Sequence, residues 1–205
     1  MRAAIRVLGA TVRLWYAHLF SATLWSLLWA ALSLTVVLWP PATAALHGVM
    51  RAIARGEPPT TADFTGAARR YAWVSFRWAL LNALAGVVWA VNVAFYGGMR
   101  SVWAGAALTL LALASALWLG AQLYVWPLLL AQETPRLWPA LRRALLMTLA
   151  APRYTLILLV AAALASALSL ATVIPLAIFW GGFLALLGQV AVQERLSVYA
   201  PHARP

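Results

Sequence analysis

The chain has 205 residues, of which 65% are hydrophobic and only 9% are charged, and its formal net charge is +11. A soluble domain has about 25% charged residues, so this sequence has too little polar surface to cover a water-soluble globule. Its apolar residues come in runs of roughly 20, the length that a helix needs to cross about 30 Å of hydrocarbon. Long Leu, Ala, Val and Trp blocks favour helices over the short alternating strands of a membrane barrel. We therefore expect an all-α, polytopic transmembrane helix bundle that forms a single membrane domain over 1–205.

The positive charge comes entirely from arginine. A strongly basic chain can bind nucleic acid. In a membrane protein, however, arginines collect in cytoplasmic loops and face anionic headgroups. The expected partner is therefore a lipid bilayer with anionic headgroups, and no nucleic acid. The chain has no cysteine, which excludes disulfides and thiolate metal sites.

The first expected span covers 15–39, with a tryptophan at each end. Pro40 and Pro41 should end it, because a residue before proline avoids the α region, and a new helix can begin at once. That helix is expected over 42–55, with an apolar face and a basic face, and Gly56 is a natural stop. Because it is too short to span, we expect it to lie at the cytoplasmic interface.

Thr60 and Asp63 have the spacing of a capping box and predict the start of the next helix. Gly97 and Gly98 predict a tight turn between the second and third spans. A second amphipathic cytoplasmic helix is expected over 135–148. The spans that follow the first are expected over 73–96, 102–123, 154–173 and 176–192, which gives five in all.

The arginines predict the orientation. Placing the arginine-rich segments after the first and third spans inside puts the C-terminus in the cytoplasm, in a multi-pass protein of the bacterial cytoplasmic (inner) membrane. With five spans the N-terminus then lies outside, which Arg2, Arg6 and Arg13 oppose. The alternatives are an even number of spans or a re-entrant segment.

Several motifs resemble one known family. They are Leu24-Trp25-Ser26-Leu27-Leu28-Trp29, Trp39-Pro40-Pro41-Ala42-Thr43-Ala44-Ala45-Leu46, Arg55-Gly56-Glu57, Asp63-Phe64, Trp126-Pro127-Leu128-Leu129 and Ala151-Pro152-Arg153-Tyr154-Thr155-Leu156. Together they resemble the YesL-like family of bacterial integral membrane proteins. The resemblance implies a domain of unknown function, often encoded near carbohydrate uptake and breakdown genes, with no established catalytic residues. It also singles out a candidate structural turn, made of Trp39, Pro40, Pro41, Thr43, Gly56 and Asp63.

Two sets of residues are candidates for function. Uncharged polar residues within the expected spans either line a solute path or make hydrogen bonds between helices, and we favour the second. They are Asn82, Asn92, Gln122 and Gln189. A basic strip on the expected interfacial helix, with its neighbours, is a candidate surface for a partner or for lipid headgroups. It consists of His47, Arg51, Arg55, Arg69 and Arg70.

The four acidic residues lie at expected helix ends, which disfavours a carrier built on a buried carboxylate. The sequence has neither a phosphate-binding Gly-rich loop nor a His-Glu-x-x-His zinc motif. We expect no catalytic residues, no metal and no cofactor. The function predicted is a non-enzymatic accessory or structural subunit associated with solute uptake, with carbohydrate as one candidate solute. It would work with other membrane subunits or as a homo-oligomer. The alternative is an oligomeric transporter or channel for a small solute, and a membrane enzyme ranks last.

Overall fold

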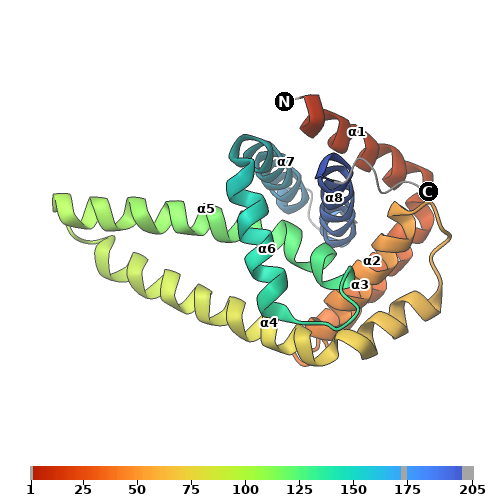
Figure 1. The fold of residues 1–205 in the computed structure, drawn as a ribbon. Coiled ribbons are helices and arrows are strands. Elements are labelled where there is room, and N and C mark those ends of the chain that lie inside the picture. The colour runs from red at the N-terminus through yellow and green to blue at the C-terminus, as the bar shows by residue number, and fades with distance from the viewer. Residues whose placement is uncertain (1, 172–174, 200–205) are drawn as a thin grey trace.

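The computed structural model describes residues 2–171 and 175–199, and every regular element within them is an α-helix. Figure 1 shows a body from which one helical hairpin projects. The projecting hairpin is formed by α4 and α5, which lie side by side, and the body holds the other helices together with the inner ends of these two. The helices are α1 (Arg2–Ala17), α2 (Leu19–Ser33), α3 (Trp39–Ala54), α4 (Thr61–Tyr96), α5 (Val102–Leu130), α6 (Leu137–Ala150), α7 (Pro152–Ala171) and α8 (Pro175–Tyr199).

The predicted continuous helix over 15–39 is not formed. The backbone leaves helical geometry at His18, where φ is −113° and ψ is 25°. The α-helix ends again after Ser33, and the Thr35 hydroxyl donates to the Leu32 carbonyl at 2.7 Å, a bond that competes with the helix. The resulting α2 has 15 residues, or about 22 Å at 1.5 Å per residue, which is shorter than the hydrocarbon core.

The helix predicted over 42–55 exists as α3, with its prolines in the first turn as expected. Residues 42–46 are all buried, so α3 packs into the body and does not leave one whole face free. Its placement at the interface stays a prediction. The crossing of α3 and α4 explains this burial. A Cβ built on Gly48 would lie 2.6 Å from the Ala67 Cβ and 2.9 Å from the Asp63 carbonyl oxygen, so the two backbones nearly touch. Leu46, Val49, Met50 and Ile53 complete the central core.

The capping box at the start of α4 is confirmed. The Asp63 N–H donates to the Thr60 hydroxyl at 3.2 Å, and the Thr60 N–H donates to the Asp63 carboxylate at 2.9 Å. From this start α4 runs for 36 residues, first along the body and then out into the hairpin. The return helix α5 is capped by Ser101 and continues past the predicted end of the third span to Leu130.

The second predicted amphipathic helix, over 135–148, is displaced by two residues. Arg136 is extended and donates its N–H to the Gln132 side chain at 2.9 Å, so α6 begins only at Leu137. Its axis then bends by 103° into α7. Residues 172 and 173, at the end of the predicted fourth span, lie outside the described residues.

Within the described residues, two helices are long and apolar enough to cross a membrane. They are α4 and α5, and the bent pair of α6 and α7 adds a third if it is counted as one span. The described part of the chain is thus helical with two or three such segments, against the five spans that the sequence predicts.

Candidate functional site

The base of the hairpin is held by two hydrogen bonds between α4 and α5. The Trp78 indole N–H donates to the Gln122 side-chain oxygen at 2.8 Å, and the Trp118 indole N–H donates to the Asn82 side-chain oxygen at 3.2 Å. The Asn82 amide N–H in turn donates to the Trp78 carbonyl at 2.9 Å. Hydrogen bonds of this kind between helices in lipid contribute about 0.6–2 kcal/mol each. These four residues therefore fix how the two helices meet.

A repeated pattern underlies this pairing. Each helix carries a tryptophan followed four residues later by a side-chain amide, Trp78 with Asn82 and Trp118 with Gln122. Residues four apart lie on one helix face, so two antiparallel helices can exchange both bonds. The two tryptophans are not among the residues predicted from the sequence, although their four-residue spacing from the amides is a signal that identifies them.

The other two predicted polar residues lie elsewhere. The Asn92 amide donates to the Val88 carbonyl of its own helix at 2.7 Å. Gln189 is buried in the body and donates to the His47 carbonyl at 3.4 Å. The four residues therefore do not line one path.

Between the Asn82–Trp118 bond and the 97–101 turn, α4 and α5 form an open cavity. We call this cavity the α4–α5 groove. Its volume is about 460 Å³, within the range of about 300–1,000 Å³ typical of pockets that hold small ligands. Apart from Asn82 and Ser115, its lining is apolar, and small side chains keep it open. The lining residues are Asn82, Ala85, Gly86, Val88, Trp89, Leu111, Ala114, Ser115, Trp118 and Leu119.

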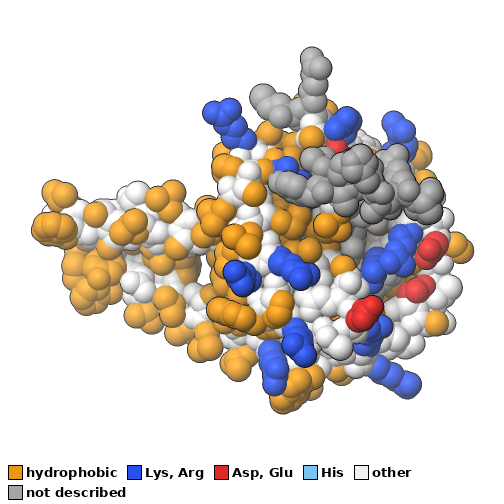
Figure 2. Space-filling view, viewed as in Figure 1, with side chains coloured by type: hydrophobic (Ala, Val, Ile, Leu, Met, Phe, Trp, Pro, Cys, Tyr) orange, Lys and Arg blue, Asp and Glu red, His pale blue; other side chains and the backbone are white. Residues whose placement is uncertain are grey.

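Hydrophobic side chains also cover the outside of the hairpin. Figure 2 shows them along its whole visible face, whereas arginines gather on the body and around the hairpin base. Val87, Val91 and Phe95 of α4 and Leu110 and Leu113 of α5 are each between 59% and 68% exposed. Such a contiguous apolar surface indicates contact with lipid or with another protein.

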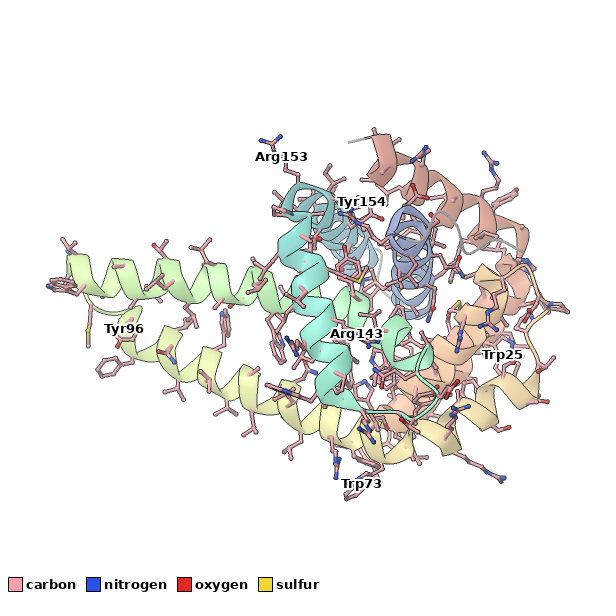
Figure 3. All side chains as sticks on the ribbon, viewed as in Figure 1. Trp25, Trp73, Tyr96, Arg143, Arg153 and Tyr154 are labelled. Carbon is pink, nitrogen blue, oxygen red and sulfur yellow. The ribbon has the colours of Figure 1, made fainter. Side chains whose placement is uncertain are left out.

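The helix α6 crosses the base of this hairpin and contacts both α4 and α5 (Figure 1). It touches α5 where a Cβ on Gly120 would lie 2.7 Å from the Thr148 methyl group. Arg142 and Arg143 on α6 are exposed, and Figure 3 shows Arg143 at the middle of that helix. These two arginines are not among the candidates predicted from the sequence.

Aromatic side chains accompany arginines at the same base. Trp73 projects from α4 at the bottom of the view in Figure 3, and the Arg77 guanidinium lies 5.2 Å from its ring centroid. On α6, Trp138 is 74% exposed. Tryptophans and arginines together are typical of the boundary between hydrocarbon and headgroups.

The predicted basic strip is divided in the structure. Arg51 donates to the Leu130 carbonyl at the end of α5, Tyr71 donates to the same oxygen at 3.4 Å, and Arg70 donates to the Glu133 carbonyl. Cationic donors at a helix C-terminus satisfy its free carbonyls and its dipole. Arg55 and Arg69 remain exposed.

His47 faces inward rather than toward a partner. Part of the residue is accessible, but its Nδ1 is buried without a hydrogen-bond partner, and its ring stacks on Trp126 at 5.4 Å. Burial lowers the pKa of His47 to about 3, so its imidazole is neutral at physiological pH. Three of the five predicted residues, His47, Arg51 and Arg70, thus make contacts within the fold. Whether these five residues bind a partner or lipid headgroups stays a prediction.

The candidate structural turn lies at contacts that hold α3 in place. The Thr43 hydroxyl donates to the Trp39 carbonyl at 2.9 Å and accepts the Trp29 indole N–H at 3.2 Å. The Trp39 ring lies 5.6 Å from Trp78. Gly56 has φ of 76°, a conformation that side-chain-bearing residues rarely adopt.

The described residues contain no group of three or more His, Cys, Asp or Glu side chains that could hold a metal ion. A family model described as "Protein of unknown function, DUF624" matches residues 22–93. The match runs from α2 to the outer part of α4 and includes several motifs of the YesL-like resemblance, although the description names no activity. No curated protein and no solved structure matches the chain.

Proposed function

We propose that this protein is a non-enzymatic accessory or structural subunit of a membrane assembly, anchored by the α4–α5 hairpin. The observation that carries the proposal is the hairpin itself. It leaves the body as two long apolar helices. Among the described side chains, these helices are hydrogen-bonded to each other only near the base, and they expose hydrophobic side chains on their outer faces. A surface of this kind is suited to lateral association in a membrane.

The dimensions of the hairpin support a transmembrane position. Residues 78–96 of α4 measure about 28 Å at 1.5 Å per residue, close to the hydrocarbon thickness of about 30 Å. Trp73 and Arg77 then lie at one interface, and Tyr96 and Arg100 at the other. The hairpin therefore fits two spans with its base at one interface and its turn at the opposite one.

The two ends of the chain support an even number of spans. Arg6 of α1 forms an ion pair with Glu194 of α8 at 2.8 Å, so the two helices lie on the same side of the protein. An even number also resolves the conflict that the N-terminal arginines raise for five spans. The arginine bias favours a cytoplasmic body, with α1 and the described part of α8 inside and, of the described segments, the 97–101 turn alone outside the bacterial inner membrane.

A single-cysteine experiment tests this placement, because the native chain has no cysteine. Gly98→Cys places a thiol in the hairpin turn, and Thr134→Cys places one in the loop between α5 and α6. A membrane-impermeant maleimide added to intact cells should label the first variant and label the second only after lysis. Labelling of both variants from the same side would refute the two-span placement.

Copurification tests the accessory role. A tagged full-length chain extracted in mild detergent should carry a stoichiometric, different membrane protein. Ala90→Trp adds bulk to the exposed face of α4 and should release that protein, whereas Ala150→Trp, at an exposed position on α6, should retain it. A lone homo-oligomer that moves solute in liposomes would contradict the proposal and support the transporter alternative. The association with solute or carbohydrate uptake rests on the YesL-like resemblance alone.

A further inference from the structure

The α4–α5 groove is left unfilled by the rest of the described chain. All of its lining residues belong to α4 or α5, and Figure 1 shows that the hairpin carries it away from the helices of the body. Three large side chains of the lining, Val88, Trp89 and Leu119, are each between 50% and 58% exposed. In a membrane this groove is therefore covered either by lipid or by another polypeptide.

The exposed area of the chain is large enough for a stable dimer. Its accessible surface is 12389 Å², whereas a compact soluble monomer of 22.2 kDa has about 9,400 Å². The difference of about 3,000 Å² exceeds the roughly 800 Å² that each partner buries in an interface of standard size. The projecting hairpin is where the structure departs from a compact body (Figure 1), so we assign this additional area mainly to it.

The polar side chains of the groove favour a polypeptide over an acyl chain. A side-chain amide has two N–H donors, and the Asn82 amide makes one bond with them, to the Trp78 carbonyl. The Ser115 hydroxyl donates to the Leu111 carbonyl at 2.7 Å and can still accept a hydrogen bond. Hydrocarbon offers these groups no partner, whereas a neighbouring helix can bond them.

A second copy of the same groove supplies matching groups. Two copies inserted in the same orientation are related by a two-fold axis along the membrane normal, so a residue near that axis meets its own counterpart at the same depth. Asn82 would then face Asn82 and Ser115 would face Ser115, and each pair contains both a donor and an acceptor. Ala85, Gly86 and Ala114 in the lining are small enough for the helices to approach closely.

We propose that two copies of the chain dimerise through their α4–α5 grooves, so that the two hairpins form a four-helix bundle within the membrane. The opposite face of α4 stays outside this bundle, because Val87 and Val91 lie about 140° and 180° around the helix from Asn82. That face remains available to a different membrane protein. The inference rests on the transmembrane placement of the hairpin and is independent of the accessory role.

Cysteine cross-linking in membranes tests the interface directly, because the native chain has no cysteine. Ser115→Cys and Ala85→Cys each place a thiol in the groove. Val87→Cys and Leu113→Cys are the matched controls, at exposed positions of the same helices outside the groove lining. Oxidation should convert each groove variant to a covalent dimer and leave both controls monomeric.

A variant that fills the groove tests the same interface without a cross-link. A Cβ at Gly86 meets nothing within 4 Å, so Gly86→Leu should fold normally as a monomer. Ala83→Leu, at an exposed position outside the lining, is its control. Light scattering in detergent should give a dimer for the wild type and Ala83→Leu. Gly86→Leu should weaken dimerisation by about tenfold or more, because an interface of small side chains cannot accept an isobutyl group.

Several results would overturn the inference. Cross-linking through Val87→Cys or Leu113→Cys but not through the groove would place the interface on the outer faces. A wild type that is monomeric in membranes and in detergent would refute the dimer, and one bound phospholipid per monomer that Gly86→Leu removes would assign the groove to lipid. The accessory role is tested separately, because dimerisation and copurification of a different membrane protein can each fail without the other. Retained helical circular dichroism in Gly86→Leu shows that a loss of the dimer is not a loss of fold.

Discussion

Replacing Gly48 with alanine should destabilise the protein by about 2 kcal/mol. Alanine in place of a helical glycine gains about 1 kcal/mol from backbone entropy. Against this, the new Cβ would lie 2.6 Å from the Ala67 Cβ and 2.9 Å from the Asp63 carbonyl oxygen. Overpacking costs about 1–3 kcal/mol, and we expect the upper end because both neighbours are fixed to the backbone of α4 and cannot rotate away.

The assay is chemical unfolding in detergent micelles, followed by helical circular dichroism. Gly66→Ala is the matched control, because Gly66 also lies in a helix but a Cβ there meets nothing within 4 Å. This control should gain up to about 1 kcal/mol. Adding Ala67→Gly to Gly48→Ala should recover part of the loss, which a double-mutant cycle measures. If Gly48→Ala were as stable as Gly66→Ala, the close crossing of α3 and α4 would be refuted.

Three further predictions concern single contacts. Thr60→Ala should lower the free energy of unfolding by about 0.5–2 kcal/mol through loss of the capping box, whereas Thr60→Ser should lose little of it. Because burial lowers the pKa of His47 from 6.5 to about 3, the unfolded state protonates first. Stability is therefore full well above pH 6.5 and falls toward pH 3, by about 2 kcal/mol between pH 6.5 and 4.5. In parallel acid titrations, His47→Phe should remove that part of the slope, and an identical slope would contradict a buried neutral imidazole. Asn82→Leu should leave the Trp118 indole N–H without its acceptor and destabilise the hairpin by about 1–3 kcal/mol. Asn92→Leu should have a smaller effect, because the Asn92 amide bonds only its own helix. Equal unfolding curves for the two variants would refute this prediction.

Local signals in the sequence predict local structure well. The start of α4 at Thr60 and Asp63, the prolines that open α3 and the turn at Gly97 and Gly98 follow from rules that act within a few residues. The break after Ser33 has no proline or glycine to mark it, and its cause is a threonine hydroxyl bonded to a carbonyl three residues back. That competition is too weak a signal to end a predicted helix.

Tertiary contacts account for the larger errors. An apolar face on 42–55 fits either an interfacial helix or a core helix. The sequence does not show that Gly48 allows the α4 backbone to pack against this helix, which is what buries it. Arg51 and Arg70 have the pattern of a free basic face until the end of α5 supplies their carbonyl acceptors. For the candidate site, the side-chain amides were identified from sequence, but their indole partners were not, because pairing requires the register between two helices.

The position of a lone arginine in the 97–101 turn has a consequence for biogenesis. Each flanking helix satisfies its own backbone hydrogen bonds in lipid, whereas the turn between them crosses the bilayer with unsatisfied backbone groups. Carrying Arg100 through the centre costs about 2.5–3.5 kcal/mol on the insertion scale, which several leucines and valines at about −0.3 to −0.6 kcal/mol each offset. The tryptophan–amide bonds near the base can form only once the returning helix has reached them, so they would lock the hairpin after translocation rather than guide it.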